Sequence, residues 1–374
     1  MFRFIPPCRQ LLTRFWLLTV LGSGMSGSAA EPSPMTVDDQ PSTETDAGPA
    51  ASDPTDAAIR RALSLLEVAS AGSADERTCF TCHSQAHPVL ALVEARRRGF
   101  EIDSTNLDRQ LEHTAAHLKR GRADYLAGRG QGGKADTAGY ALWTLQAGGV
   151  SAPETTDPVV GWLFDQQLEA GNWKRSSDRP PSEASHFTTT YLALRAIGHF
   201  ADDDRQASAA KAFERAQRWL IDHAGEETED RVFRLLALQA VDAPEPVQQA
   251  AADALLRSQQ DDGGWSQIES LTSDAYATGT VLVALFRSGH LTPADPRYQN
   301  GIGYLVDHQQ DDGSWHVVSR SRPFQTYYET GFPHGDDQFI STSATAWATT
   351  ALLLTRPASP AADNTPTGSA DPTR

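Results

Sequence analysis

The chain has 374 residues, with 32 Lys and Arg against 48 Asp and Glu and a formal net charge of −16. Binding to nucleic acid or to anionic lipid needs clustered cations, so this balance argues against both classes of partner. Three cysteines are too few for a disulfide scaffold. Hydrophobic residues make up 39% of the chain and run along its whole middle, so a large core is possible.

Residues 1–30 have the pattern of a secretory signal. Three arginines make the start positive, an apolar stretch covers 15–21, and 28–30 (SAA) is typical of a cleavage site. An uncleaved membrane anchor is the alternative, but the apolar stretch is well short of the roughly 20 residues that span a bilayer. We therefore expect a periplasmic or secreted protein with no transmembrane segment after cleavage.

Loss of this signal would change both charge and cysteine count. The formal charge would fall from −16 to −19, because the segment holds three arginines and no acid. Cys8 would leave with it, so that Cys79 and Cys82 remain. Residues 31–55 and 357–374 are rich in Pro, Ser, Thr and Ala, which predicts a disordered linker and a disordered tail.

The middle of the chain shows apolar residues at helical spacing and little strand alternation. Five segments are small, apolar and aromatic, and their leucines recur at steps of 49, 44, 47 and 68 residues. Such a period predicts repeated helix pairs. The long last step contains an inserted loop at 316–340. The five segments are 136–145, 187–197, 232–241, 273–286 and 343–354.

Three other segments are more amphipathic, and each carries Gln, then a Gly-containing turn, then Trp. They are 162–173, 255–265 and 304–315. Gly can end a helix in left-handed dihedrals. Gln can hydrogen-bond backbone at a neighbouring helix end, and Trp can cover that contact. A weaker unit at 219–223 lacks the Trp-bearing turn.

These three segments resemble the QW motif of the terpenoid cyclase and protein prenyltransferase superfamily, which includes squalene–hopene cyclases. The resemblance covers roughly residues 105–356. It implies an all-α fold, the α/α toroid, with inner and outer helices around a central cavity. The apolar segments would be inner helices, and the QW segments would follow outer ones. A helical solenoid that does not close is the alternative.

The superfamily's chemistry does not carry over to these residues. Squalene–hopene cyclases protonate an alkene with an Asp-x-Asp-Asp-Thr-Ala motif. Here the nearest match is 134–138 (KADTA), which keeps only Asp136 and the following Thr-Ala. A strong acid needs paired carboxyls, so Asp136 is interpreted as a helix N-cap. Prenyltransferases need a zinc site with a Cys ligand, whereas both remaining cysteines precede the repeat.

Residues 79–83 (CFTCH) form a C-x-x-C-H sequence of the kind to which haem c is covalently attached. Cys79 and Cys82 can form thioethers with the haem, and His83 can ligate its iron. Haem attachment follows export, in agreement with the signal. A redox disulfide and half of a zinc site are the alternatives. We expect this haem-attachment segment, 56–104, to pack on the toroid.

The second axial ligand is constrained by composition. After the signal the only methionine is Met35, in the linker, so His/Met ligation is not expected. His113 and His117 lie four residues apart on one predicted helical face and are the candidate metal ligands. Alternatively, both lie at the surface or contact the haem propionates. We predict a low-potential bis-His haem or a five-coordinate haem.

Candidate cavity residues come from the apolar segments and from the inserted loop, since long loops on a rigid scaffold often carry function. An aromatic lining suits an apolar, isoprenoid-like ligand, and plain core packing is the alternative for each residue. The candidates are Asp136, Tyr140, Trp143, Tyr191, Asp274, Tyr276, Phe324, His334, Asp336, Asp337 and Trp347.

The sequence therefore predicts an exported haem protein with a squalene-cyclase-like toroid and a redox or ligand-binding role. Whether it is an enzyme is left open. One alternative is an enzyme of the isomerase or lyase class acting on a terpenoid or glycan, and another is a structural interaction module. A redox partner would need positive surface to complement the chain's negative charge.

Overall fold

The computed structural model describes residues 53–322 and 326–359. The predicted signal, most of the linker, most of the tail and Phe324 lie outside the described residues. No helix in the described part of the chain is long and apolar enough to cross a membrane.

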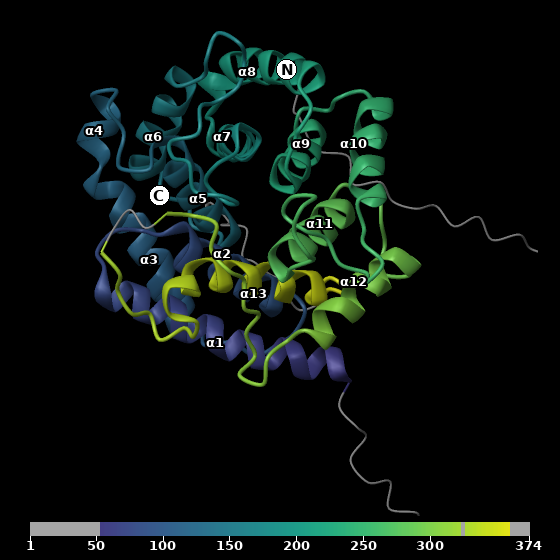
Figure 1. The fold of residues 1–374 in the computed structure, drawn as a ribbon. Helices are drawn as coiled ribbons and strands as arrows, with labels where there is room; N and C mark the ends of the chain where they lie inside the picture. Colours follow the sequence, from purple (N-terminus) through teal and green to yellow (C-terminus); the bar gives the residue numbers. More distant parts are fainter. Residues whose placement is uncertain (1–52, 323–325, 360–374) are drawn as a thin grey trace, which may run out of the picture. The chain divides into compact units, whose positions relative to one another are not determined.

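The described chain is all-α, and its long helices form two concentric rings (Figure 1). The inner ring consists of α2 (His87–Arg97), α5 (Lys134–Ala147), α7 (His186–Phe200), α9 (Thr228–Ala240), α11 (Ala275–Arg287) and α13 (Gln338–Leu353). The outer ring consists of α1 (Pro54–Glu76), α3 (Ser104–Arg120), α6 (Pro153–Asp165), α8 (Gln206–Asp222), α10 (Glu245–Arg257) and α12 (Pro296–Asp307). A short helix, α4 (Arg122–Leu126), lies against α6.

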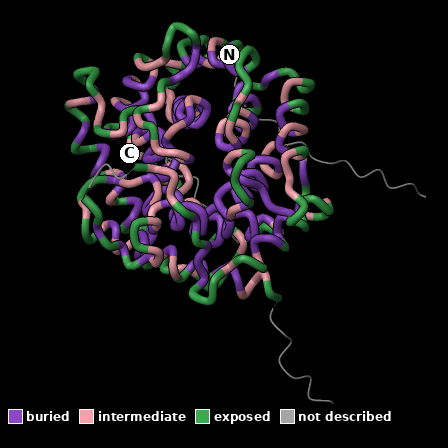
Figure 2. Tube along the Cα trace, viewed as in Figure 1, coloured by how far each residue is buried: buried purple, intermediate pink, exposed green. Residues whose placement is uncertain are grey.

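Each inner helix contacts the next inner helix along the chain, and α2 contacts both α13 and α5. The ring is therefore closed, which confirms the α/α toroid and excludes the open solenoid. Figure 2 shows that the inner helices are mostly buried and that exposed residues gather on the outer ring. The five apolar segments predicted as inner helices are α5, α7, α9, α11 and α13.

Small residues let the inner helices approach closely. A Cβ atom at Gly139 of α5 would lie 2.5 Å from the Cβ atom of Leu192 in α7. A Cβ atom at Gly279 of α11 would lie 2.7 Å from backbone atoms of α13. Packing at this distance explains why the inner segments are rich in Gly, Ala and Thr.

Residues 56–104, the segment that contains the C-x-x-C-H motif, supply the first helix pair of the ring. α1 packs on the outside, against α2, α3, α12 and α13. α2 follows a π-helical turn, Cys82–Ala86, and takes the inner place between α13 and α5. The resemblance seen in the sequence covered only 105–356, whereas the described ring also includes this N-terminal pair.

The third QW motif shows what the pattern does physically. Gln309 Nε2 donates to the Gly313 carbonyl in its own turn and to the Ala58 carbonyl on α1, both at 2.9 Å. Trp315 Nε1 donates to the Leu305 carbonyl at the end of α12, at 2.8 Å. The motif therefore ties the last outer helix to the first one, and this contact closes the outer ring.

The other two motifs repeat this geometry. Gln167 joins the turn after α6 to Ala212 of α8, and Gln259 joins the turn after α10 to Arg297 of α12. The turn glycines Gly171 and Gly263 have φ of 107° and 86°, values that favour Gly. In all three motifs the Trp backbone N–H donates to a Thr hydroxyl of the following inner helix, namely Thr190, Thr278 or Thr345.

We predict that Gln309→Ala lowers the free energy of unfolding by about 1–3 kcal/mol. It removes three hydrogen bonds, two donated by Nε2 and one accepted from Arg61, and leaves buried carbonyl groups less well satisfied. Gln310→Ala is the matched control, since Gln310 is exposed and no side-chain hydrogen bond is found for it in the described chain. Urea unfolding followed by circular dichroism measures both variants. Equal stability of the two variants would contradict a ring closed by Gln309.

Candidate functional site

The C-x-x-C-H motif lies where the chain enters the inner ring. Residues 78–81 precede the π-helical turn, and the Gln85 side chain accepts a hydrogen bond of 2.9 Å from the Thr81 backbone N–H. This bond holds the motif against the start of α2. Cys79 is exposed, whereas Cys82 is buried.

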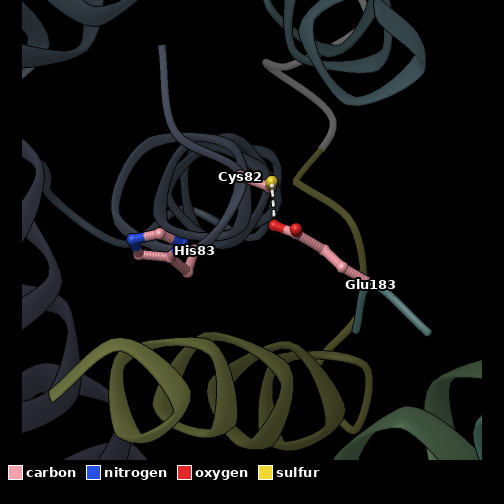
Figure 3. A group of neighbouring side chains, drawn as sticks. All are labelled: Cys82, His83 and Glu183. Atoms are coloured by element: carbon pink, nitrogen blue, oxygen red, sulfur yellow. Dashed lines mark hydrogen bonds between the residues drawn. The ribbon is translucent and has the colours of Figure 1, made fainter. Parts of the chain in front are cut away.

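The Cys82 thiol contacts a carboxylate that comes from the loop between α6 and α7. Cys82 Sγ lies 3.0 Å from Glu183 Oε1, and Figure 3 shows the two groups pointing toward one another. Glu183 is 7% exposed and forms an ion pair with Arg179. Ligand atoms of Cys82, His83 and Glu183 all lie within 4.8 Å of one another.

Burial determines the protonation of this cluster. It raises the pKa of the Cys82 thiol to about 11, so the thiol is neutral near pH 7 and donates to Glu183. Burial, with a smaller contribution from the Arg179 charge, lowers the pKa of His83 to about 3. The imidazole is therefore neutral and keeps the lone pair that a metal ligand needs. His83 Nε2 is buried and has no hydrogen-bond partner in the described structure.

His83 borders a cavity of about 290 Å³. Its walls come from the π-helical turn, the loop that carries Arg179 and Glu183, the inserted loop and the start of α13. The His83 ring lies 4.5 Å from that of Phe339 in α13. Charged and hydroxyl side chains, including Arg322 and Tyr327, line much of the cavity.

His113 and His117 lie on α3 against the backbone of the motif. His113 Nε2 is 3.4 Å from the Cys79 carbonyl oxygen, and the Phe80 backbone N–H donates to His117 Nδ1 at 3.3 Å. Neither histidine lines the cavity at His83. The structure therefore brings His83 together with Glu183 and Arg179, and it uses His113 and His117 to hold the outer side of the motif.

The predicted aromatic cavity residues pack on one another at the ring axis. The Trp143 ring lies 6.3 Å from that of Tyr140, 5.7 Å from Tyr191 and 6.1 Å from Trp347. The cavity left beside Trp143 and Trp347 has a volume of about 10 Å³, hardly enough for one water molecule. These side chains therefore fill the axis in this structure.

Two acids predicted near the cavity occupy the starts of inner helices. Asp274 is the N-cap of α11 and accepts from the Ala277 backbone N–H at 2.9 Å. Burial raises its pKa to about 6. Asp136 was predicted as an N-cap, but this is wrong, because α5 begins at Lys134 and its N-cap is Gly133.

Asp136 instead joins three segments. Its carboxylate accepts from the Thr189 hydroxyl on α7 and from the hydroxyl and backbone N–H of Ser176, at 2.7 and 3.0 Å. The side chain is buried. It therefore connects α5 to α7 and to the loop that carries Glu183.

Glu229, an acid in the first turn of α9, is a buried residue that no pattern in the sequence indicates. Glu229 is 4% exposed, and its carboxyl group meets the Thr188 hydroxyl at 2.9 Å and the Tyr276 hydroxyl at 3.1 Å. Burial raises its pKa to about 8. The surrounding sequence, ETEDR, is typical of an exposed surface. Only packing against α7 and α11 buries this residue.

The inserted loop partly caps the ring and partly lines the cavity. His334 stacks on His316 with ring centroids 4.5 Å apart, and its Nε2 lies 2.8 Å from Ser314 Oγ. Asp337 contacts His316 Nε2 at 2.9 Å. Asp336 and Asp337 both border the cavity at His83, so this loop contributes to the same site as the C-x-x-C-H motif.

Comparisons with known proteins identify the fold. The fold is the α/α toroid of terpene cyclases and of some glycosidases. Similar structures include a variant of the type II terpene cyclase MstE from Scytonema in complex with geranylgeranyl dihydroxybenzoate (18% identity, TM-score 0.52, covering 81% of this chain and 97% of that one). A glycosidase in complex with glucose is also similar (12% identity, TM-score 0.50, covering 80% and 98%).

Residues 196–365 match the family described as squalene-hopene cyclase C-terminal domain. Among curated proteins, drimenyl diphosphate synthase of Streptomyces showdoensis is 29% identical over 160 residues, which are 38% of this chain and 28% of that protein. The chain spans little more than a quarter of the length of the curated relatives it matches.

We predict that Glu229 makes the protein less stable at alkaline pH. Its pKa in the folded protein is about 8, above the ordinary value of 4.5. The protonated carboxyl group therefore contributes its full stabilisation below pH 4.5, and this stabilisation is lost as the pH rises toward and through 8. Between pH 6 and pH 9 the free energy of unfolding should fall by a few kcal/mol more in the wild type than in Glu229→Gln, at about 1.4 kcal/mol per pKa unit.

Glu226→Gln is the control, because Glu226 is an exposed acid three residues away. Chemical unfolding at several pH values measures all three proteins. The prediction fails if Glu229→Gln and Glu226→Gln show the same dependence on pH.

Proposed function

We propose that this chain is a c-type haem protein built on a terpene-cyclase-like toroid, with haem bound covalently through Cys79 and Cys82 and its iron ligated by His83. One observation carries this proposal: His83 Nε2 is buried and has no hydrogen-bond partner among the described residues. His83 belongs to the same motif as the two cysteines, and it lines a cavity. A bound haem would supply one-electron redox chemistry and, at an open coordination position, ligand binding.

The surrounding residues fit this group chemically. The neutral His83 imidazole can act as a ligand without first losing a proton. Thioether formation at Cys82 would remove the S–H that now donates to Glu183, and Glu183 would keep its ion pair with Arg179. Both ends of the haem-binding sequence are thus supported by neighbouring polar groups.

Of the two ligation states left open by the sequence, the cavity favours the five-coordinate one. Among the described residues that line it, His83 is the only histidine and none is a methionine. His113 and His117 instead contact the backbone at Cys79 and Phe80. Covalent haem also implies export, so a periplasmic or secreted location and a redox partner with positive surface belong to the same proposal.

A metal ion held by Cys82, His83 and Glu183 is the second candidate. Their ligand atoms lie within 4.8 Å of one another, and three protein ligands with a remaining open position are typical of catalytic zinc. A thioether at Cys82 would exclude this metal site, because the thiolate would no longer be available.

An apolar ligand at the ring axis is supported less well. The MstE structure contains geranylgeranyl dihydroxybenzoate, and the fold alone is shared with it. In this chain an isoprenoid would need Trp143 and Trp347 to turn aside, since the cavity beside them is about 10 Å³. An isoprenoid extracted from purified protein and identified by mass spectrometry would support such a movement. An enzyme acting on a terpenoid or glycan rests on the family match over residues 196–365 and on fold likeness.

Two variants distinguish haem from a metal ion, because Cys79 lies outside the metal cluster and Glu183 lies outside the haem motif. The exported protein is made with haem-attachment machinery present, and its haem absorbance, intact mass and metal content are measured. We expect the wild type and Glu183→Gln to carry one covalent haem, and Cys79→Ser to lose one of the two thioether bonds.

The opposite pattern would replace the haem proposal with the metal one. Stoichiometric zinc in the wild type and in Cys79→Ser, its loss in Glu183→Gln, and no haem absorbance in any of them would establish the metal site. Haem in the wild type with a high-spin spectrum would support five-coordinate iron, and a low-spin spectrum that His113→Ala or His117→Ala alters would contradict it.

A further inference from the structure

A second cavity lies near the carboxyl ends of three inner helices. Its volume is about 380 Å³, and residues of α5, α7 and α9 line it together with Phe213 of α8. The loop that carries Glu183 precedes the start of α7, whereas this cavity adjoins its end at His199. It shares no lining residue with the cavity at His83. The two cavities are therefore separate sites at opposite ends of α7.

Arg195 of α7 supplies the only full charge in the described lining of this cavity, where no residue is acidic. Its Nη1 donates to the Tyr191 hydroxyl at 3.3 Å, and its guanidinium carbon lies 4.8 Å from the centre of the Trp143 ring. Its Nε is buried and has no hydrogen-bond partner in the part of the chain that the structure describes. Two aromatic residues therefore orient the guanidinium and leave some of its N–H groups unused.

Gln146 lies close to this guanidinium, on the helix that carries Trp143. The two residues of α5 are three positions apart and so are neighbours on one helix face, and Gln146 lines the same cavity as Arg195. The Gln146 side-chain oxygen is buried, and no partner for it is found within residues 53–322 and 326–359. Such an atom is costly. Because an amide both donates and accepts, a ligand with a hydroxyl group would satisfy it.

The rest of the wall is partly polar and partly apolar. His199 lies one turn beyond Arg195 on α7, and burial together with the Arg195 charge lowers its pKa. The imidazole is therefore neutral near pH 7. A Cβ atom at Gly198 would lie 3.2 Å from Phe213 Cζ, so that this ring packs directly on α7. The apolar side chains of the lining are Leu194, Phe213 and Leu236.

We propose that this cavity binds a small carboxylate that carries a hydroxyl group and an apolar part. The carboxylate binds the unused N–H groups of Arg195, whose planar fork of donors matches carboxylate oxygens. The hydroxyl group binds the Gln146 amide, and the apolar part lies against Leu194, Phe213 and Leu236. A neutral ligand would leave the arginine without a counter-charge, and an acid without a hydroxyl group would leave Gln146 without a partner. The site goes beyond the proposed haem function and does not depend on it.

Calorimetric titration of the whole exported protein with phenyllactate and with hydrocinnamate, at low ionic strength, tests the proposal. The two ligands have the same carboxylate and the same phenyl group, and only phenyllactate has the hydroxyl group. We expect one phenyllactate to bind per chain and hydrocinnamate to bind several-fold more weakly, because it leaves the Gln146 amide unpaired.

Two variants separate the roles of the polar groups. Arg195→Gln should weaken the binding of both ligands at least about tenfold, since it removes the charged partner of the carboxylate. Gln146→Leu should weaken the binding of phenyllactate only, so that the two ligands bind with equal affinity. Arg257→Gln is the matched control, because Arg257 is an exposed arginine on α10 and its loss changes the net charge equally. This control should bind both ligands as the wild type does.

Three results would overturn the proposal: no phenyllactate binding, equal affinity of the wild type for the two ligands, or equal weakening by Arg195→Gln and Arg257→Gln. Circular dichroism shows whether each variant is folded. If Arg195→Gln does not fold, the comparison of the two ligands on the wild type and on Gln146→Leu still decides the outcome. None of these measurements depends on the haem content of the protein, so a failure of the haem proposal leaves them valid.

Discussion

The hydrogen bond from Gln309 to the Ala58 carbonyl on α1 is the contact on which the architecture depends. Inner helices such as α13 are buried on nearly every side, so they are stable only if both neighbours in the ring are present. An open chain of helix pairs would leave one face of α13 and one of α5 exposed to water. Closure places α2 between them. The C-x-x-C-H motif, which precedes α2, is thereby brought into the wall of the ring.

This closure explains why the candidate site sits where it does. Once α2 is an inner helix, the π-helical turn at its start faces the loops that lead into α7 and α13. Glu183 and Phe339 then lie beside Cys82 and His83, although they are 100 or more residues away along the chain.

Much of the fold could be predicted because its signals are local. The Gln-Gly-Trp pattern makes hydrogen bonds to its own turn and helix, and the apolar period reflects one helix at a time. The N-terminal helix pair has no QW motif of its own. α1 meets the third QW motif through the backbone carbonyl of Ala58, which any residue carries, and through the side chain of Arg61. Asp136 was misassigned because the helix starts two residues earlier, at Lys134, after a left-handed glycine.

By itself, the sequence determined the helical repeat, the QW contacts and the presence of a C-x-x-C-H motif, since each depends on neighbours in the chain. Only the tertiary structure decided that Glu183 meets Cys82, that Glu229 is buried, and that Tyr140, Trp143 and Trp347 fill the axis. The physical reason is that burial and charge pairing depend on which helices become neighbours. That choice is made by packing around the closed ring, where residues from distant segments first meet.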